Sequence, residues 1–266
     1  MYSGINGMKN FQTKLDVIGN NIANVNTFGF KKGRVVFKDM ISQTISGATA
    51  GEAGTSGGIN PKQVGLGSQL ASIDTIDTEG STQTTGRVLD LAIQGDGYLA
   101  VLRGENTYFT RAGNLYLDNT GNLVTSSGDL VLAEDGTTAV SLGVLPSEIS
   151  NLSISESGQI SYILAADGEL TEGPIIGVAR FDNNAGLEKA GENLFRASGA
   201  SGEAVFGAPG GETGAGKLVS GVLEMSNVDL SEEFTEMIVA QRGFQANTRI
   251  ITTSDEILQE LVNLKR

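Results

Sequence analysis

The sequence predicts an α+β protein, mainly β, with a discontinuous terminal α-helical coiled-coil domain and a β-rich middle domain, joined by an extended connector. Three observations lead to this fold class. Apolar residues repeat every seven positions near both chain ends. Short apolar runs separated by turn residues fill the middle. Glycine is abundant, at 37 of 266 residues, and proline is scarce, at 4, which suits many tight turns.

The N-terminal stretch is predicted to form an amphipathic helix that ends near Asn26-Thr27, before Gly29. Two apolar series repeat every seven residues and are offset by three, which is the a/d pattern of a coiled-coil seam. Ordinary core packing of an amphipathic helix explains this seam equally well when it is taken alone. The seam consists of Met8, Phe11, Leu15, Ile18, Ile22 and Val25.

The C-terminal stretch is predicted to be a second helix, from about Asp229 to Lys265. Asp229 and Glu232 have the spacing of a capping box. A helix of this length spans on the order of 50 Å, which is more than a compact domain of this size needs, so its apolar stripe requires a partner. Matching seams at both ends favour a terminal coiled coil. The stripe consists of Met237, Phe244, Ile251 and Leu258.

Three domains follow along the chain. Residues 1–30 with 226–266 are predicted to form a terminal helical domain, residues 31–84 an extended connector, and residues 85–225 a β-rich domain. Within the connector, Ser46–Gly58 is rich in small residues and is expected to be a mobile loop. A basic cluster precedes it, which we interpret as a solvated face or an intersubunit contact: Lys31, Lys32, Arg34 and Lys38.

The domain at residues 85–225 is predicted to be β because its apolar runs are short and alternate with Gly, Asn and Asp turns. A hairpin is expected to turn at Asn119-Thr120-Gly121, and a second one lies in Ser153–Ile163. Further strands are expected in Leu89–Arg103 and Ile175–Phe181.

Composition argues against several functions. The net charge of −13 opposes binding to nucleic acid and to anionic lipid. The absence of Cys and His removes thiolate and imidazole chemistry. Asp118–Asn122 and Asp182–Gly186 lack the spacing of calcium loops, and turn chemistry explains them. We therefore predict no catalytic, cofactor-binding or metal-binding residue, no enzyme activity and no membrane insertion.

Long motifs at both ends carry a family resemblance. GNNIANVNTFGFKKGR (Gly19–Arg34) and SNVDLSEEFTEMIVAQRGFQANTRIITTSDEILQELVNL (Ser226–Leu264) resemble the two terminal signatures of the bacterial flagellar rod-and-hook family. The middle blocks LDLAIQGDGYLAV, FTRAGNLYLDNTGNLVT and GLEKAGENLF are also similar to that family, so the resemblance covers nearly the whole chain.

The resemblance implies a structural subunit that polymerises into a hollow helical tube, with residues 1–30 and 226–266 as its polymerisation domain and residues 85–225 as its outer domain. It implies export outside the cell by the flagellar type III apparatus, without a cleavable signal peptide, and a place in the hook or basal body. Asn60–Tyr98 is most similar to hook subunits, so a short hook subunit of the Gram-positive type, which transmits torque from rod to filament, is expected first, with a distal rod subunit as the alternative. The implied partners are copies of itself, the distal rod, the hook cap and the hook–filament junction.

Further expectations remain open at this point. Members of the family often begin a few residues earlier, so the chain is expected to be slightly truncated or to have a misassigned start. The stretch Ser46–Gly58 is expected to let the inner and outer domains slide. An adhesin with a helical stalk would not require seams at both ends, and a carbohydrate-active enzyme would require a residue cluster that the sequence lacks.

Overall fold

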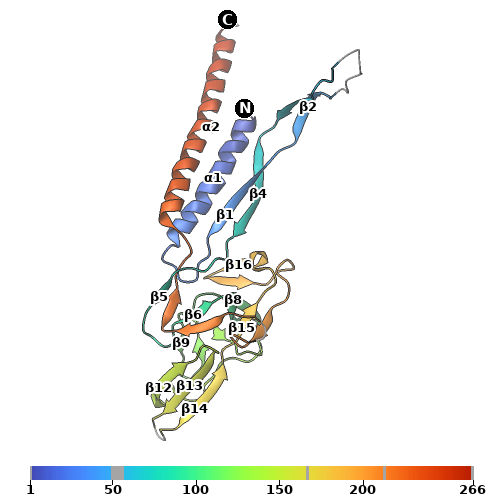
Figure 1. Cartoon of the computed structure of the whole chain (residues 1–266). Helices are drawn as coiled ribbons and strands as arrows, with labels where there is room; N and C mark the ends of the chain where they lie inside the picture. The colour runs from blue at the N-terminus through green and yellow to red at the C-terminus, as the bar shows by residue number, and fades with distance from the viewer. Residues whose placement is uncertain (1, 49–56, 166–167, 212–213, 265–266) are drawn as a thin grey trace. The chain divides into compact units, whose positions relative to one another are not determined.

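The computed structural model describes residues 2–48, 57–165, 168–211 and 214–264, which divide into two compact units. The helical unit contains Met1–Ala23, Gly33–Thr75 and Asp229–Arg266, and the β-rich unit contains Asn24–Lys32 and Ile76–Val228. A helix at each end and a β-rich middle confirm the predicted α+β, mainly β fold class (Figure 1). The units differ from the three predicted domains within residues 24–84 and at residues 226–228: most of the predicted connector groups with the helices, and residues 226–228 group with the β-rich unit.

Two antiparallel helices, α1 (Tyr2–Ala23) and α2 (Leu230–Leu264), lie side by side in the helical unit (Figure 1). α1 ends earlier than predicted because a turn follows it, in which Thr27 donates from its backbone N–H to the Asn24 carbonyl oxygen at 3.1 Å and from its hydroxyl to the Asn24 side chain. α2 begins where it was predicted to begin. The Asp229 side chain caps it by accepting a hydrogen bond from the Ser231 N–H at 2.8 Å.

The predicted connector is mostly a long antiparallel hairpin. β1 (Gly33–Asp39) pairs with β4 (Ser68–Thr75), and β2 (Ser42–Ser46) pairs with β3 (Lys62–Gly65). α1 packs on the β1–β4 part, where the Asn10 amide donates to the Ser68 carbonyl oxygen at 2.8 Å. Residues 49–56 of the predicted mobile loop lie outside the described residues.

The β-rich unit is built on a nine-stranded sheet with the path β16-β17-β8-β7-β11-β10-β9, to which β15 is added through β7 and β18 through β15. Its strands are β7 (Tyr98–Arg103), β8 (Asn106–Thr110), β9 (Tyr116–Leu117), β10 (Leu123–Val124), β11 (Leu130–Val131), β15 (Val178–Arg180), β16 (Glu188–Gly191), β17 (Leu194–Arg196) and β18 (Val205–Gly207).

Smaller sheets complete the β-rich unit. A three-stranded sheet has the order β12-β13-β14, and two pairs are β19-β6 and β20-β5. Their bounds are β5 (Thr82–Thr84), β6 (Leu91–Gln94), β12 (Ile149–Ile154), β13 (Gln159–Leu164), β14 (Leu170–Ile175), β19 (Lys217–Ser220) and β20 (Val222–Glu224). Two 3-10 helices are η1 (Pro146–Glu148) and η2 (Asn184–Gly186).

Both faces of β7 are buried. Leu99 and Val101 belong to the larger apolar cluster of the unit, whereas Tyr98 and Ala100 belong to a second, aromatic cluster. The two predicted hairpins are present as β9–β10 and β12–β13. The predicted strand Ile175–Phe181 is instead divided: β14 ends at Ile175 and β15 begins at Val178. A Cβ at the intervening Gly177 would lie 2.2 Å from the Ala133 carbonyl oxygen, so the backbones approach closely there.

Candidate assembly surface and buried ion cluster

The seam between α1 and α2 depends on small residues as much as on apolar ones. A Cβ at Gly243 would lie 2.5 Å from the Phe11 ring, and a Cβ at Gly7 would lie 2.9 Å from the amide of Asn247. Because the helices are antiparallel, moving four residues toward the start of α1, from Phe11 to Gly7, moves four residues toward the end of α2, from Gly243 to Asn247. The start of α1 therefore lies level with about Thr252.

Polar pairs lie on the same seam, toward the end of α1. The Asn21 amide donates to the Glu233 carboxylate at 3.2 Å and to the Gly33 carbonyl oxygen at 2.9 Å. The Lys14 ammonium group donates to the carboxylate of Glu236. A buried polar pair between two helices favours one alignment, so the Asn21–Glu233 pair helps to set the register of α1 against α2, whereas the Lys14–Glu236 pair is more exposed.

The predicted seam residues take different positions in this packing. Ile18 is buried, whereas Val25 lies beyond the end of α1, in the turn that belongs to the β-rich unit. Leu258 is exposed, because it lies past the level at which α1 starts. The remaining predicted residues are half-buried in the helical unit: Met8, Phe11, Leu15, Ile22, Met237, Phe244 and Ile251. Their role in assembly stays a prediction.

Sequence reasoning missed the small and polar members of the seam. Ala240 is fully buried and Glu233 is nearly so. Together with the predicted Met237, Phe244 and Ile251 and with Asn247, these positions alternate at intervals of four and three residues, which is an a/d pattern. The signal was present in the spacing, but a search limited to apolar residues does not detect it.

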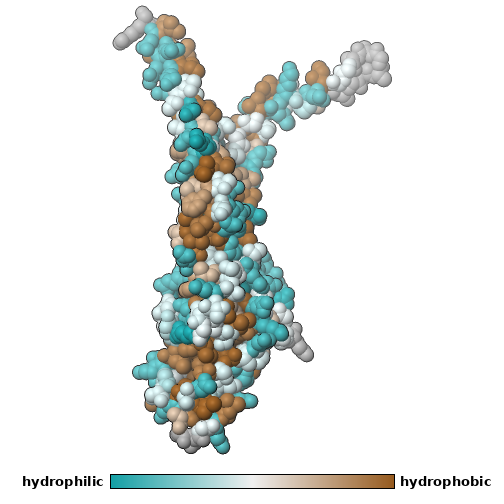
Figure 2. Space-filling view, turned by 60° about the vertical axis from the view of Figure 1, so that its left-hand side comes forward, coloured by the Kyte–Doolittle hydropathy of each residue, from teal (hydrophilic) through white to brown (hydrophobic). Residues whose placement is uncertain are grey.

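Among the described residues, no helix lies beside the end of α2. From Thr253 to Leu264, which we call the overhang, α2 continues past the start of α1 for on the order of 18 Å (Figure 1). Leu258 and Leu261 continue the a/d pattern of the seam. Every large apolar residue of the overhang is at least 45% exposed, and Figure 2 shows hydrophobic surface at this end of α2: Ile257, Leu258, Leu261, Val262 and Leu264.

A second exposed apolar surface lies on the part of the hairpin that contains β2 and β3. Every residue of these two strands is exposed. We call residues 40–46 and 59–67 the arm. Exposed apolar side chains gathered on one segment are typical of a surface that contacts another molecule. Figure 2 shows hydrophobic residues along the arm, whose exposed large apolar side chains are Ile41, Ile45, Ile59, Val64 and Leu66.

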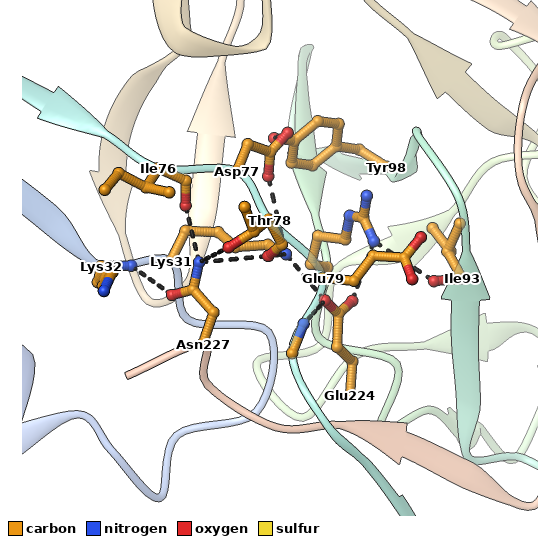
Figure 3. A network of polar contacts seen from close by, with 12 residues as sticks. Lys31, Lys32, Ile76, Asp77, Thr78, Glu79, Ile93, Tyr98, Glu224 and Asn227 are labelled. Carbon is orange, nitrogen blue, oxygen red and sulfur yellow. Dashed lines mark hydrogen bonds and ion pairs between the residues drawn. The ribbon is translucent and has the colours of Figure 1, made fainter. Parts of the chain in front are cut away.

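The β-rich unit contains an ion cluster that is almost fully buried (Figure 3). The Lys31 ammonium group donates to Glu224 Oε1 at 2.8 Å and to the Thr78 carbonyl oxygen at 2.7 Å. The Arg111 guanidinium donates to Glu224 Oε2 at 3.0 Å. The side chains of Lys31, Arg111 and Glu224 are each at most 2% exposed. The interpretation of Lys31 as part of a solvated basic face is therefore wrong, because Glu224 compensates its charge in the interior.

Further groups enclose this cluster. Asp77 accepts a hydrogen bond from the Tyr98 hydroxyl at 2.8 Å and lies 3.8 Å from the Lys31 ammonium group. Burial raises the pKa of Tyr98, and Asp77 raises it further. Burial alone would raise the pKa of Glu224. The positive charges of Arg111 and Lys31 and the Gly80 N–H outweigh burial, so the pKa of Glu224 lies below its usual range.

The direction of the Glu224 shift predicts a dependence of stability on pH. Because the pKa of Glu224 in the folded protein is below the ordinary value of 4.5, its contribution to stability is present above pH 4.5 and is lost as pH falls through the lower, folded-state pKa. We expect Glu224→Gln to lower the melting temperature most at neutral pH, and the difference from wild type to narrow below pH 4.5. Thermal unfolding followed by circular dichroism across this range tests it, and a constant difference would contradict it.

Within the described ranges, no three Asp or Glu residues lie close enough together to hold a metal ion. Asp118 instead accepts hydrogen bonds from the Asn119 N–H and the Thr120 hydroxyl, as the predicted turn requires. No described helix is both long and apolar enough to cross a membrane.

Paired terminal helices, exposed apolar surfaces and a β-rich unit are typical of a structural subunit. Comparison with protein families agrees with this class of protein. Residues 1–31 match the model described as flagella basal body rod protein, residues 92–162 match the flagellar hook protein FlgE/F/G D1 domain, and residues 219–264 match the flagellar basal body rod FlgEFG protein C-terminal model.

Whole-length relatives refine this class. The chain is 60% identical over 266 residues to the flagellar basal-body rod protein FlgG of Bacillus subtilis, covering all of this chain and 98% of that protein. It is 40% identical over 271 residues to FlgG of Borreliella burgdorferi, covering 100% and 98%. It is 32% identical to the flagellar hook protein FlgE of the same organism, over an alignment of 439 residues that covers 100% and 99%. The chain belongs to the flagellar rod and hook family and is a structural protein, not an enzyme.

Proposed function

We propose that the chain is a distal rod subunit of the flagellar basal body. The observation that carries this proposal is the 60% identity to a basal-body rod protein of nearly equal length. The hook relative is only 32% identical, and its alignment extends over 439 positions against 266 residues in this chain. The comparisons therefore favour the alternative prediction over the hook subunit that was expected first.

In this proposal the subunit polymerises with copies of itself into a hollow helical tube and contacts neighbouring axial proteins. The overhang and the arm are the surfaces that support self-assembly, since both expose large apolar residues in the monomer. The predicted seam residues pair α1 with α2, and the end of α2 is the overhang. Export by the flagellar type III apparatus, without a cleavable signal, is part of the proposal. The hook cap and the hook–filament junction go with the less favoured hook function.

Labelling of intact cells separates rod from hook. The chain has no Cys, so a single cysteine on the exposed surface of the β-rich unit, Leu170→Cys, provides a unique site for a thiol label. A rod subunit should react with a bulky, membrane-impermeant maleimide only after the envelope is permeabilised, whereas a hook subunit should react in intact cells. The control is a single exposed cysteine in an established hook protein, which should be labelled in intact cells. Labelling of this chain in intact cells would refute the rod proposal.

A further inference from the structure

The buried ion cluster joins parts of the chain that are far apart in sequence. Lys31 is separated from Glu224 by 193 positions, and Arg111 from Glu224 by 113. Lys31 lies in the short segment 24–32, Arg111 directly follows β8, and Glu224 is the last residue of β20. All three belong to the β-rich unit. Along the chain, Lys31 and Arg111 therefore both come before Glu224, whose carboxylate pairs with both of them.

Glu224 is central to this cluster because both of its carboxylate oxygens are used. One oxygen accepts from Lys31 and from the Gly80 N–H at 3.0 Å, and the other accepts from Arg111. Carbonyl oxygens also accept from both cations, but carry no full charge. Asp77 lies 3.8 Å from Lys31 and makes its hydrogen bond with Tyr98. Without Glu224, two cations would share the interior with this single carboxylate, and an arginine cannot lose its proton to avoid the cost.

The backbone around the cluster is equally dependent on distant segments. The Gly29 N–H donates to the Glu224 carbonyl oxygen at 2.9 Å, and the Met225 N–H donates to the Ser81 carbonyl oxygen at 2.8 Å. A Cβ at Gly29 would lie 2.6 Å from the backbone carbon of Arg111, so this segment lies directly against the arginine. The site is therefore closed only when residues 29–31, 80–81, 111 and 224–225 are all in place.

We propose that the ion cluster makes folding of the β-rich unit conditional on Glu224. The unit does not close on Lys31 and Arg111 until the segment that directly precedes α2 has joined them. A chain that is synthesised from its N-terminus therefore keeps its β-rich unit unfolded until nearly all residues of that unit have emerged. This inference is independent of the proposed rod function, because it concerns one chain before any assembly.

The first test uses the full chain at equilibrium. Glu224→Gln should raise the unfolding equilibrium constant by about 10²–10³-fold, because it leaves two buried cations with one carboxylate, that of Asp77, which already accepts a hydrogen bond from Tyr98. Protection of the Val101 and Phe109 amides from hydrogen exchange should fall by the same factor, since the whole unit opens. The matched control is Glu156→Gln, which breaks an exposed ion pair with Lys217 in the same unit and should change the constant by only a few-fold. An effect of Glu224→Gln no larger than the control's would overturn the proposal.

A rescue variant separates charge from packing. Lys31→Met, Arg111→Met and Glu224→Met together replace the ions with apolar side chains and should restore amide protection toward the wild-type level. If the triple variant is as unprotected as Glu224→Gln, the charges do not impose the condition and the proposal fails.

The second test follows the chain during synthesis. Full-length chains are held on stalled ribosomes by C-terminal linkers of two lengths. The longer linker places Glu224 outside the exit tunnel, whereas the shorter one exposes the chain only as far as Ser220. Protease resistance of the β-rich unit should appear in wild type only when Glu224 has emerged. Lys31→Met with Arg111→Met should gain resistance with Glu224 still hidden. Wild-type resistance before Glu224 emerges, or no gain in the double variant, would each contradict the proposal.

Discussion

The double substitution Leu258→Ser and Leu261→Ser is expected to leave the monomer folded and to prevent its polymerisation. Both leucines are at least 45% exposed in the monomer, so their loss removes almost no internal packing. Burying each leucine against a second copy would contribute about 2 kcal/mol, and losing both contacts should raise the critical concentration for assembly by roughly a thousandfold. Sedimentation measures the assembly, and circular dichroism checks that helix content is retained.

The matched control for this prediction is Glu256→Ser with Glu260→Ser. These residues lie on the same overhang, are exposed, and change helix propensity by a similar amount without removing apolar surface. The control should assemble as wild type does. Polymerisation of the leucine variant at the wild-type critical concentration would show that the overhang is not an assembly surface.

Gly243→Leu is expected to disrupt the pairing of α1 with α2. A Cβ at this position lies 2.5 Å from the Phe11 ring, so the larger side chain forces the helices apart at the middle of their seam. Overpacking of this kind costs about 1–3 kcal/mol, which exceeds the gain of up to about 1 kcal/mol from replacing a helical glycine. Amide exchange along α1 should become fast, while exchange in the core of the β-rich unit should stay at the wild-type rate.

Two variants identify the cause of this effect. Phe11→Ala combined with Gly243→Leu should restore part of the pairing, because the small residue then lies opposite the large one. Gly19→Ala is the control for glycine replacement: nothing lies within 4 Å of its Cβ position, so the change should stabilise α1 by about 0.5–1 kcal/mol. If Gly243→Leu leaves α1 as protected as wild type, the described seam is wrong.

The terminal helices were predictable because their signals are local. Seven-residue spacing and the cap at Asp229 are properties of neighbouring residues, and both α2 and its cap are present as expected. The end of α1 was placed too late because the Asn24–Thr27 turn competes with the helix through side-chain hydrogen bonds that the apolar pattern does not record.

The register of the seam was not predictable from apolar residues alone. Phe11 packs where Gly243 leaves room for its ring, and a glycine carries no hydrophobic signal. Asn21 and Glu233 read as surface residues in a single sequence, because only the opposite helix makes their burial favourable.

Long-range electrostatics explains why Lys31 was wrongly predicted to be exposed to solvent. Lys31 stands in a run of basic residues, and such runs are usually solvated. Its burial depends on Glu224 at the other end of the β-rich unit's sequence, a pairing that no local pattern indicates. The arm is a comparable case, since the partners β2 and β3 are separated by a small-residue stretch that reads as a plain connector.

We expect a second copy of the chain to cover the overhang in the assembled protein. Because the chain contains no Cys, Leu261→Cys places a unique thiol on the overhang, and Leu170→Cys places a control thiol on the exposed edge of the β-rich unit. The rate of reaction with a small maleimide is measured for each variant before and after polymerisation. We predict that Leu261→Cys reacts rapidly as a monomer and at least tenfold more slowly in the polymer, while Leu170→Cys changes little. Equal rates for Leu261→Cys in monomer and polymer would contradict the account.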